Sequence, residues 1–251
     1  NTPPLRSSPV QVGTNTSWAY VSNCRNGTSI ATKTDGTLWC WGDNSKGQCG
    51  QNTNSSPSYS GISSPTQVGS GTDWNYDNGS KIVVGYQRVF AIKTNGTLWG
   101  WGRTAQGQLG LNEGSYKDYS SPTQIPGTNW STIKSVGEVI ATKTDGTLWS
   151  WGYNSQGTLG HNTGGAGTDR SSPIQVGTDN DWDEPLGGLG GYGGVITCRK
   201  TDDTLWTWGS NSYGEQGLND RVARSSPTQL PGKWVQTAGG ALNGTLGIKY
   251  P

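Results

Sequence analysis

The most regular pattern in the chain is a short hairpin of alternating polar and apolar positions. In residues 141–152, two stretches of β-forming residues flank Asp145-Gly146, a pair that supplies the positive φ angles of a two-residue hairpin turn. Trp149 and Trp151 are two positions apart, so in a strand their side chains lie on one face. The pattern therefore predicts two antiparallel strands that share a large aromatic area, and we expect both tryptophans to be largely buried.

This hairpin is repeated along the chain. Copies occupy residues 31–42 and 91–102, and a diverged copy with Asp202-Asp203 at the turn occupies residues 197–209. Ser-Ser-Pro triplets recur at intervals of 51 to 57 residues, and a tryptophan follows each of them. A turn similar to Gly-Gln-Leu-Gly follows each hairpin. The sequence is therefore that of a repeat protein.

Each repeat offers four short strands. Around the hairpin at 141–152, we expect an inner strand at 131–136, a second at 139–144 and a third at 147–152. An outer strand is expected after each Ser-Ser-Pro triplet, as at residues 123–125, because proline is tolerated at a sheet edge. Four antiparallel strands repeated at this spacing are typical of the blades of a β-propeller.

These motifs and their order resemble a known repeat. The Asp-Gly-x-Leu-Trp-x-Trp-Gly hairpin, the Gly-Gln-Leu-Gly turn, the Ser-Pro-x-x-Val strand and the Trp-led strand are similar to the regulator of chromosome condensation repeat. The resemblance covers nearly the whole chain, from residue 7 to 249, and implies a β-propeller. Members of this family range from a nucleotide-exchange factor for a small GTPase to an inhibitor of β-lactamase. The repeats here look more like those of bacterial surface proteins and phage virion proteins.

The expected fold is all-β, a single β-propeller domain over residues 1–251. Its repeats are expected at residues 7–62, 63–119, 120–170 and 171–224, with a partial repeat at 225–251. This count gives five blades, one of them incomplete, because the last repeat stops where its Asp-Gly turn should begin. We expect residues 9–12 to form a strand that pairs with the last blade and closes the ring.

Composition excludes several classes of protein. Leu, Ile, Val and Phe make up only roughly 15% of the chain, a value that alone would suggest disorder. The formal charge of +1, the 13 tryptophans and the 41 glycines indicate instead an all-β protein with aromatic packing. Near-neutral charge argues against a nucleic-acid-binding surface. A run of about 18 apolar residues, as a membrane span requires, is absent from the sequence.

The sequence provides no catalytic, cofactor-binding or metal-binding site. His161 is the single histidine and stands where sister repeats have leucine, and the hairpin aspartates are explained by turn chemistry. The four cysteines follow no metal-ligand spacing and are either small buried apolar residues or disulfide partners.

The connections from third to outer strand differ in every repeat, so they can distinguish a partner. They hold tyrosines and basic residues of the kind enriched at binding surfaces. The candidate partner-binding residues are Tyr59, Tyr116, Lys117, Tyr119, Arg170, Arg221 and Arg224. Unselected variation in solvent loops is the alternative explanation.

We therefore expect a non-enzymatic structural or binding propeller. The resemblance of the repeats to those of phage virion proteins favours a virion surface component that contacts other proteins of the assembly. Such a component would be either a capsid decoration or a tail-associated protein. The expected location is extracellular or on the virion surface. The alternative is a secreted or cell-surface lectin or adhesin that binds glycans, and a third possibility is a GTPase regulator or enzyme inhibitor.

Overall fold

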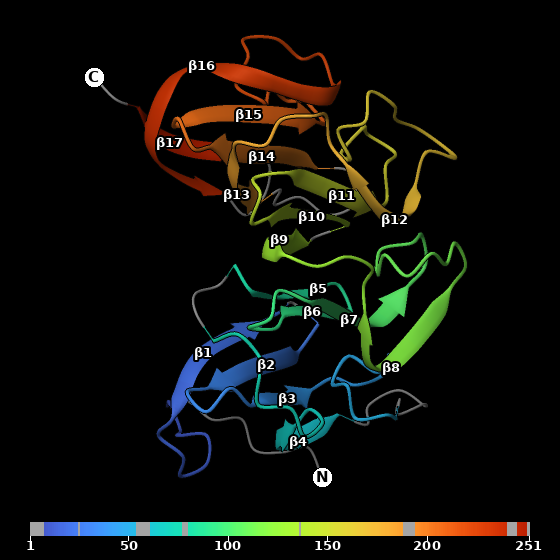
Figure 1. Cartoon of the computed structure of the whole chain (residues 1–251), viewed down its shortest axis with the longest axis vertical. Coiled ribbons are helices and arrows are strands. Elements are labelled where there is room, and N and C mark those ends of the chain that lie inside the picture. The colour runs from blue at the N-terminus through green and yellow to red at the C-terminus, as the bar shows by residue number, and fades with distance from the viewer. Residues whose placement is uncertain are drawn as a thin grey trace.

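The computed structural model describes residues 8–24, 26–53, 61–76, 80–135, 137–187, 194–239 and 245–249. Their regular structure consists of antiparallel β-sheets that follow one another along an arc (Figure 1). No helix with the length and apolarity of a membrane span occurs in this part of the chain. The all-β propeller architecture expected from the sequence is confirmed.

The first two sheets have the spatial orders β1-β2-β3-β4 and β5-β6-β7-β8. Their strands are β1 (Trp18–Asn23), β2 (Thr28–Lys33), β3 (Leu38–Gly42), β4 (Ile62–Gln67), β5 (Ile82–Gly85), β6 (Arg88–Ile92), β7 (Leu98–Thr104) and β8 (Lys117–Gln124).

The remaining sheets have the orders β9-β10-β11-β12 and β13-β14-β15-β16-β17. Their strands are β9 (Trp130–Ser135), β10 (Glu138–Lys143), β11 (Leu148–Gly152), β12 (Arg170–Gln175), β13 (Trp182–Gly187), β14 (Val195–Lys200), β15 (Thr204–Gly209), β16 (Arg224–Gly239) and β17 (Thr245–Lys249).

Each of the first three sheets is one blade, and the fourth sheet joins a four-stranded blade to two strands of the next through the long strand β16. The inner strands β1, β5, β9 and β13 contact one another in turn, so they line the concave side of the arc. The outer strand that begins a sequence repeat pairs with the hairpin of the repeat before it, as β8 pairs with β7. One repeat therefore contributes to two neighbouring blades, which ties the blades together.

The hairpin turns form as the sequence predicts. Gly146 has φ +79°, and Asp145 Oδ1 accepts hydrogen bonds from the Thr147 backbone N–H (3.0 Å) and hydroxyl (2.7 Å). These hydrogen bonds lower the pKa of Asp145. The Thr147 hydroxyl in turn accepts a hydrogen bond from the Trp149 indole (2.8 Å). The turn residues thus fix the orientation of the first tryptophan of the pair.

The two tryptophans of the pair differ in burial. Trp151 is fully buried, and its indole N–H donates to the Gln108 carbonyl of the preceding blade (3.0 Å). Trp149 is only half-buried, between Trp130 and the ammonium of Lys143, which lies 4.1 Å from its ring centroid. The expected burial is complete for Trp151 and partial for Trp149, because the neighbouring blade covers only the second tryptophan.

The cysteines fall into two groups. Cys40 of β3 and Cys49 of the following turn form a disulfide with a Cα–Cα distance of 5.2 Å. Cys198 is a buried free thiol, whose pKa is raised by burial, and Cys24 is half-buried and free. The disulfide fastens the turn to the hairpin in the first blade.

The closing strand expected at residues 9–12 is not found among the described residues. Residues 9–12 lie outside any strand, and Val10 and Val12 are 56% and 45% exposed. The long strand β16 pairs with β15 through its first half and with β17 through its second half. The first blade and the β16–β17 pair lie at opposite ends of the arc (Figure 1). The described residues therefore form four four-stranded blades and two strands of a fifth, not a closed ring.

A buried carboxyl lies at the start of β10. Glu138 is 2% exposed, and burial raises its pKa to about 8 despite the charge of the buried Arg88 nearby. One of its carboxyl oxygens has no hydrogen-bond partner among the described residues. The folded protein therefore holds this group in its neutral form at physiological pH.

Stability is therefore expected to depend on pH through Glu138. The folded state binds this proton more tightly than the unfolded chain, so the stabilisation is complete below about pH 4.5 and is lost as pH rises towards about 8. Glu138→Gln mimics the neutral carboxyl and should unfold at a higher denaturant concentration than the parent at pH 8. At pH 4 the two proteins should unfold at similar denaturant concentrations. A parent-to-variant difference that stayed constant from pH 4 to pH 8 would contradict the assignment.

Candidate functional site

The third-to-outer connections of the four blades, together with the end of β7, form a surface that we call the loop face, defined by the described residues 43–53, 103–116, 153–169 and 210–223. One asparagine in each of three of these loops makes the same pair of bonds. Asn154 Oδ1 accepts from the Leu159 N–H (2.9 Å), and its amide donates to the Thr163 carbonyl (3.0 Å). Asn44 and Asn211 make the equivalent bonds. These hydrogen bonds therefore link the turn of each of these three blades to the loop that follows it.

Tyr116 is the central candidate of the loop face. Its side chain is 52% exposed, and the Arg103 guanidinium lies 4.6 Å from the centroid of its ring. The Lys46 ammonium of the neighbouring blade lies 5.8 Å from the same ring and 3.7 Å from the Asp118 carboxylate. A hydrogen bond with Tyr116 raises the pKa of Lys46. An exposed aromatic ring is thus held between two cations from two blades.

Lys117 and Tyr119 lie in β8 rather than in a loop. Lys117 pairs with Thr104 and Tyr119 with Gly102 across the sheet. The Lys117 ammonium lies 2.8 Å from the Glu113 carboxylate and 4.7 Å from the Tyr119 ring centroid. Tyr119 packs against the core of the first two blades, and burial raises its pKa. Tyr119 therefore packs beneath the loop face, while the Lys117 side chain is exposed beside it.

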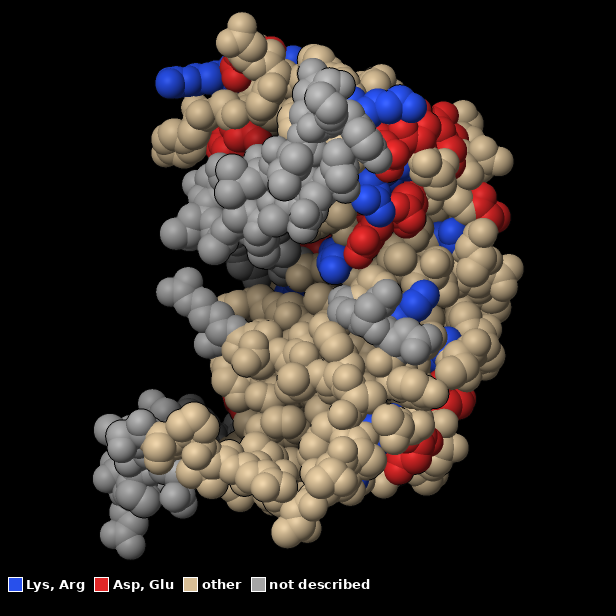
Figure 2. All heavy atoms as spheres, turned by 90° about the vertical axis from the view of Figure 1, so that its left-hand side faces the viewer, with Lys and Arg blue, Asp and Glu red and all other residues tan. Residues whose placement is uncertain are grey.

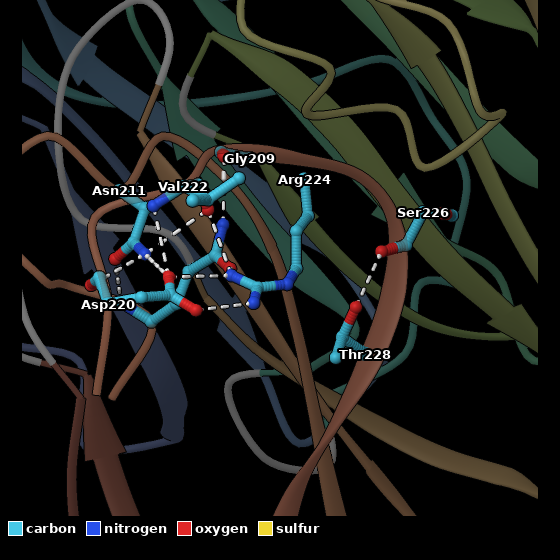
Figure 3. Close-up of polar contacts among 8 residues, drawn as sticks. Gly209, Asn211, Asp220, Val222, Arg224, Ser226 and Thr228 are labelled. Atoms are coloured by element: carbon cyan, nitrogen blue, oxygen red, sulfur yellow. Dashed lines mark hydrogen bonds and ion pairs between the residues drawn. The ribbon is translucent and has the colours of Figure 1, made fainter. Parts of the chain in front are cut away.

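Two of the predicted arginines close their own loops. Arg170 donates to the carbonyls of Thr168 (3.0 Å) and Asp169 (3.1 Å). Arg224 forms an ion pair with Asp220 (2.7 Å) and donates to the Gln216 amide oxygen (3.0 Å), and Figure 3 shows the Arg224–Asp220 pair beside Asn211. The Arg224 hydrogen bond lowers the pKa of Asp220 to about 2. These side chains position loops, and their role as contact anchors stays a prediction.

The fourth blade presents a second exposed group. Arg221 is exposed, as predicted, and beside it in the sequence Val222 is 61% exposed. Tyr213 is 79% exposed on the turn of the same blade. Sequence reasoning missed Tyr213, Lys46 and Arg103, because the first two adjoin the repeated turn and Arg103 lies in β7, outside the variable loops. Tyr59 lies outside the described residues.

His161 does not form an exposed catalytic pair. Its Nε2 lies 3.0 Å from the Ser150 hydroxyl, which donates to the Leu159 carbonyl (2.6 Å) and is fully buried. Burial lowers the pKa of His161. These hydrogen bonds join β11 to the turn of the third blade. Within the described ranges, no group of three or more His, Cys, Asp or Glu residues could hold a metal ion.

Charges on the surface are interleaved. Figure 2 shows acidic side chains beside basic ones in small groups on an otherwise uncharged surface. Among the ion pairs, the Lys200 ammonium lies 2.6 Å from the Asp179 carboxylate and 2.9 Å from that of Asp181, and the Arg199 guanidinium lies 2.5 Å from the Asp183 carboxylate. Local pairing of opposite charges agrees with the formal charge of +1, and the described residues on the face drawn in Figure 2 show no basic patch of the kind that binds nucleic acid.

Comparison with known proteins identifies the repeats. Profiles described as "Regulator of chromosome condensation (RCC1) repeat" match residues 26–48, 95–137, 145–182 and 202–242, together more than half of the chain. The human protein "Probable E3 ubiquitin-protein ligase HERC3" is 31% identical over 103 residues, which cover 41% of this chain and 9% of that protein.

Solved structures share the fold. Prp20p from Saccharomyces cerevisiae has a TM-score of 0.73 at 16% identity, over 98% of this chain and 60% of that chain. Human WBSCR16 has a TM-score of 0.67 at 22% identity, over 85% of this chain and 52% of that chain. The chain thus spans between half and two thirds of the length of these propellers.

The matched repeats coincide with the hairpins, turns and Trp-led strands of the blades described above. The chain therefore belongs to the regulator of chromosome condensation (RCC1) repeat family.

Proposed function

We propose that this chain is a non-enzymatic, protein-binding propeller that contacts its partner through the loop face. The observation that carries the proposal is the exposed Tyr116 ring held between Arg103 and Lys46. Tyrosine and arginine provide much of the binding energy at protein interfaces, and a ring that is already held in place loses little entropy on binding. Lys117 extends this surface along β8.

Proteins of similar fold support protein partners in general. Prp20p from Saccharomyces cerevisiae binds Gsp1p and histones, and Kap60 has been crystallised bound to yeast RCC1 (Prp20). These are properties of that protein. They support protein binding as a use of this fold, and they do not exclude a GTPase-regulating role for this chain.

The finer assignments stay predictions. The virion surface role rests only on the resemblance of the repeats to those of phage virion proteins. The lectin or adhesin alternative rests on exposed aromatic residues. An extracellular location is supported by the Cys40–Cys49 disulfide, because structural disulfides persist mainly in oxidising compartments. A glycan array tests the lectin alternative, which predicts repeated sugar sites and therefore multivalent binding.

The proposal is tested by a matched pair of surface variants. One variant carries Tyr116→Ser and Arg103→Ser, and the control carries Tyr76→Ser, a 41%-exposed tyrosine that follows the Trp at the start of the second blade. Each variant is immobilised and incubated with an extract of the organism that produces the protein. The proteins that each variant retains are compared by quantitative mass spectrometry. We expect at least one protein to be retained about tenfold less by the loop-face variant only, since a central anchor contributes more than about 1 kcal/mol.

Direct titration of that protein should then show only mild salt dependence, unlike phosphate-driven binding, because the net charge is near zero. Equal retention by all variants, or loss only with Tyr76→Ser, would show that the loop face is not the binding surface.

A further inference from the structure

The four complete blades share a lysine that packs on two tryptophans. One tryptophan leads the inner strand and the other is the first of the hairpin pair. Each ammonium lies 3.6 to 4.9 Å from the centroids of these two rings. The lysines stand at the end of the second strand of each blade and are Lys33, Lys93, Lys143 and Lys200. Contact with an aromatic ring stabilises a cation but does not neutralise its charge.

Two of the blades supply a carboxylate for this lysine. In the second blade, Asp73 Oδ1 lies 3.0 Å from the Lys93 ammonium. In the fourth blade, Asp179 and Asp181 lie 2.6 and 2.9 Å from the Lys200 ammonium. These aspartates stand one or three positions before the tryptophan that leads the inner strand. The chain itself therefore shows that this place binds a carboxylate.

The third blade has the same lysine without an acidic partner. The positions three and one before Trp130 hold Gly127 and Asn129 instead of aspartate. The ion pairs of the described residues do not include Lys143. The carboxylate of Asp145, two residues further on, accepts hydrogen bonds within its own hairpin turn. The third blade therefore lacks an acidic residue where the blades on both sides of it have one.

Two donors of the third blade converge beside Gly127. A Cβ on this glycine would lie 3.5 Å from the Lys143 ammonium and 3.5 Å from the Trp130 indole nitrogen. In the second blade, a Cβ on Gly71 would lie 3.5 Å from the corresponding indole nitrogen, 3.9 Å from the ammonium and 3.1 Å from Asp73 Oδ1. The same point in space is thus the one beside which a carboxylate oxygen lies in the second blade.

The indole of Trp130 adds a second donor. Trp130 is 2% exposed, and its indole N–H has no hydrogen-bond partner among the described residues. The Trp74 indole N–H of the second blade is also without a partner there, because Asp73 is tethered to the chain and pairs with the lysine only. A carboxylate that is not tethered has two oxygens with which to accept from both donors.

The point where the donors meet is open to solvent. Gly127 and Asn129 are exposed, and Lys143 is half-buried. A half-buried ammonium beside a buried N–H binds a carboxylate through charge-assisted hydrogen bonds that water screens less than at a fully exposed site. A carboxylate from outside the chain can therefore reach both donors.

The first blade differs from the third. Lys33 also lacks an acidic partner within the described ranges, but it is only 6% exposed. The position that corresponds to Gly127 holds Asn15, whose Oδ1 accepts from the Ser17 N–H (2.8 Å). Little of the Lys33 side chain is therefore open to a ligand.

We propose that Lys143, Trp130 and the exposed link at residues 127–129 form a binding site for a carboxylate group. The group belongs either to a small organic acid or to an acidic side chain of a polypeptide. The ammonium pairs with one carboxylate oxygen, and the indole N–H donates to the other. The site lies at the hairpin-turn end of β11, whereas the loop face begins after the other end of this strand. It is therefore separate from the cluster at Tyr116.

The indole resonances of the full chain test the proposal. The ¹⁵N-labelled protein is titrated with sodium acetate, and sodium chloride at equal ionic strength is the control. The Trp130 indole signal is identified by its loss in Trp130→Phe. We expect a saturable shift of this signal with acetate and none with chloride, because a carboxylate presents two acceptor oxygens to the two donors.

Two blocked tripeptides separate the sources of the carboxylate. One has the sequence Gly-Asp-Gly and the other has Asn in place of Asp. Binding of the Asp peptide that is tighter than that of acetate would assign the site to acidic side chains of polypeptides. Tighter binding of acetate would assign it to small organic acids. The Asn peptide should not shift the Trp130 signal.

Three variants locate the site, and circular dichroism checks that each of them folds. Lys143→Gln removes the ammonium and should weaken acetate binding at least about tenfold, since hydrogen bonds to charged groups are the stronger ones. Lys93→Gln, the matched control, removes the equivalent cation of the second blade and should leave the Trp130 response unchanged. Asp73→Asn removes the carboxylate of the second blade, so the Trp74 indole signal should then respond to acetate as well.

Absence of a saturable shift with acetate would overturn the proposal, as would an equal response to chloride or to the Asn peptide. Unchanged acetate binding in Lys143→Gln would place the ligand elsewhere. A Trp74 signal that stays silent in Asp73→Asn would contradict the second blade as the template for the site. All of these signals arise at the hairpin-turn end of the blades, so they do not depend on whether Tyr116 contacts a partner.

Discussion

Replacing Trp151 by alanine is expected to lower the free energy of unfolding by about 3–5 kcal/mol, the range for a core aromatic residue. Trp151 is fully buried in the cluster that joins the second and third blades. Its loss also leaves the Gln108 carbonyl without the indole N–H that it binds at 3.0 Å. Chemical denaturation followed by circular dichroism measures the change, which should appear as a lower midpoint.

Trp41 is the matched control for this prediction. It occupies the same hairpin position in the first blade, but it is only half-buried and its indole donates no hydrogen bond among the described residues. Trp41→Ala should therefore cost clearly less than Trp151→Ala. Equal losses would mean that the tryptophan stabilises its own hairpin and that the junction adds nothing.

Gly146→Ala is expected to destabilise the fold by about 3 kcal/mol through backbone strain and overlap. Gly146 has φ +79°, and a Cβ there would lie 1.9 Å from the Asn180 carbonyl oxygen, which belongs to the link into the next blade. That link is also held by a hydrogen bond from the Trp182 N–H to the Gly146 carbonyl (3.0 Å). Relief of the overlap must therefore move the contact between two blades. The melting temperature and the denaturation midpoint should both fall.

Gly177→Ala separates strain from overlap. Gly177 has φ +64° with nothing within 4 Å of the Cβ position, so its substitution costs only the left-handed conformation, about 1 kcal/mol. If the two substitutions destabilised the protein equally, close approach of the link at Gly146 would have no energetic role.

The local elements could be predicted from the sequence because their causes are local. Asp145-Gly146 defines a hairpin turn by its own backbone preferences, and alternation places Trp149 and Trp151 on one face. Recurrence of these signals at a nearly constant interval indicates blades. The strands observed at β9, β10 and β11 begin and end within two residues of those expected.

The surroundings of the candidate site residues could not be predicted, because loop sequences do not say what their side chains contact. Tyr116 is exposed as expected, but Arg224 is held by Asp220, and Tyr119 lies in β8. Arg103, whose guanidinium lies beside the Tyr116 ring, belongs to β7, a strand outside the variable connections. Residues from different turns meet only after the blades have packed.

The sequence by itself determined the hairpins, the blade repeat and the aromatic composition of the core, since turn geometry and side-chain alternation act over a few residues. Only the tertiary structure decided which tryptophan is fully buried, because the turn of the preceding blade covers Trp151 and leaves Trp149 half-buried. It also decided that Cys40 and Cys49 are close enough to form a disulfide, whereas Cys198 stays a buried thiol. Burial of the tryptophans depends on what neighbouring blades bring together, and the disulfide depends on how the turn folds back on its own hairpin, so local sequence patterns determine neither.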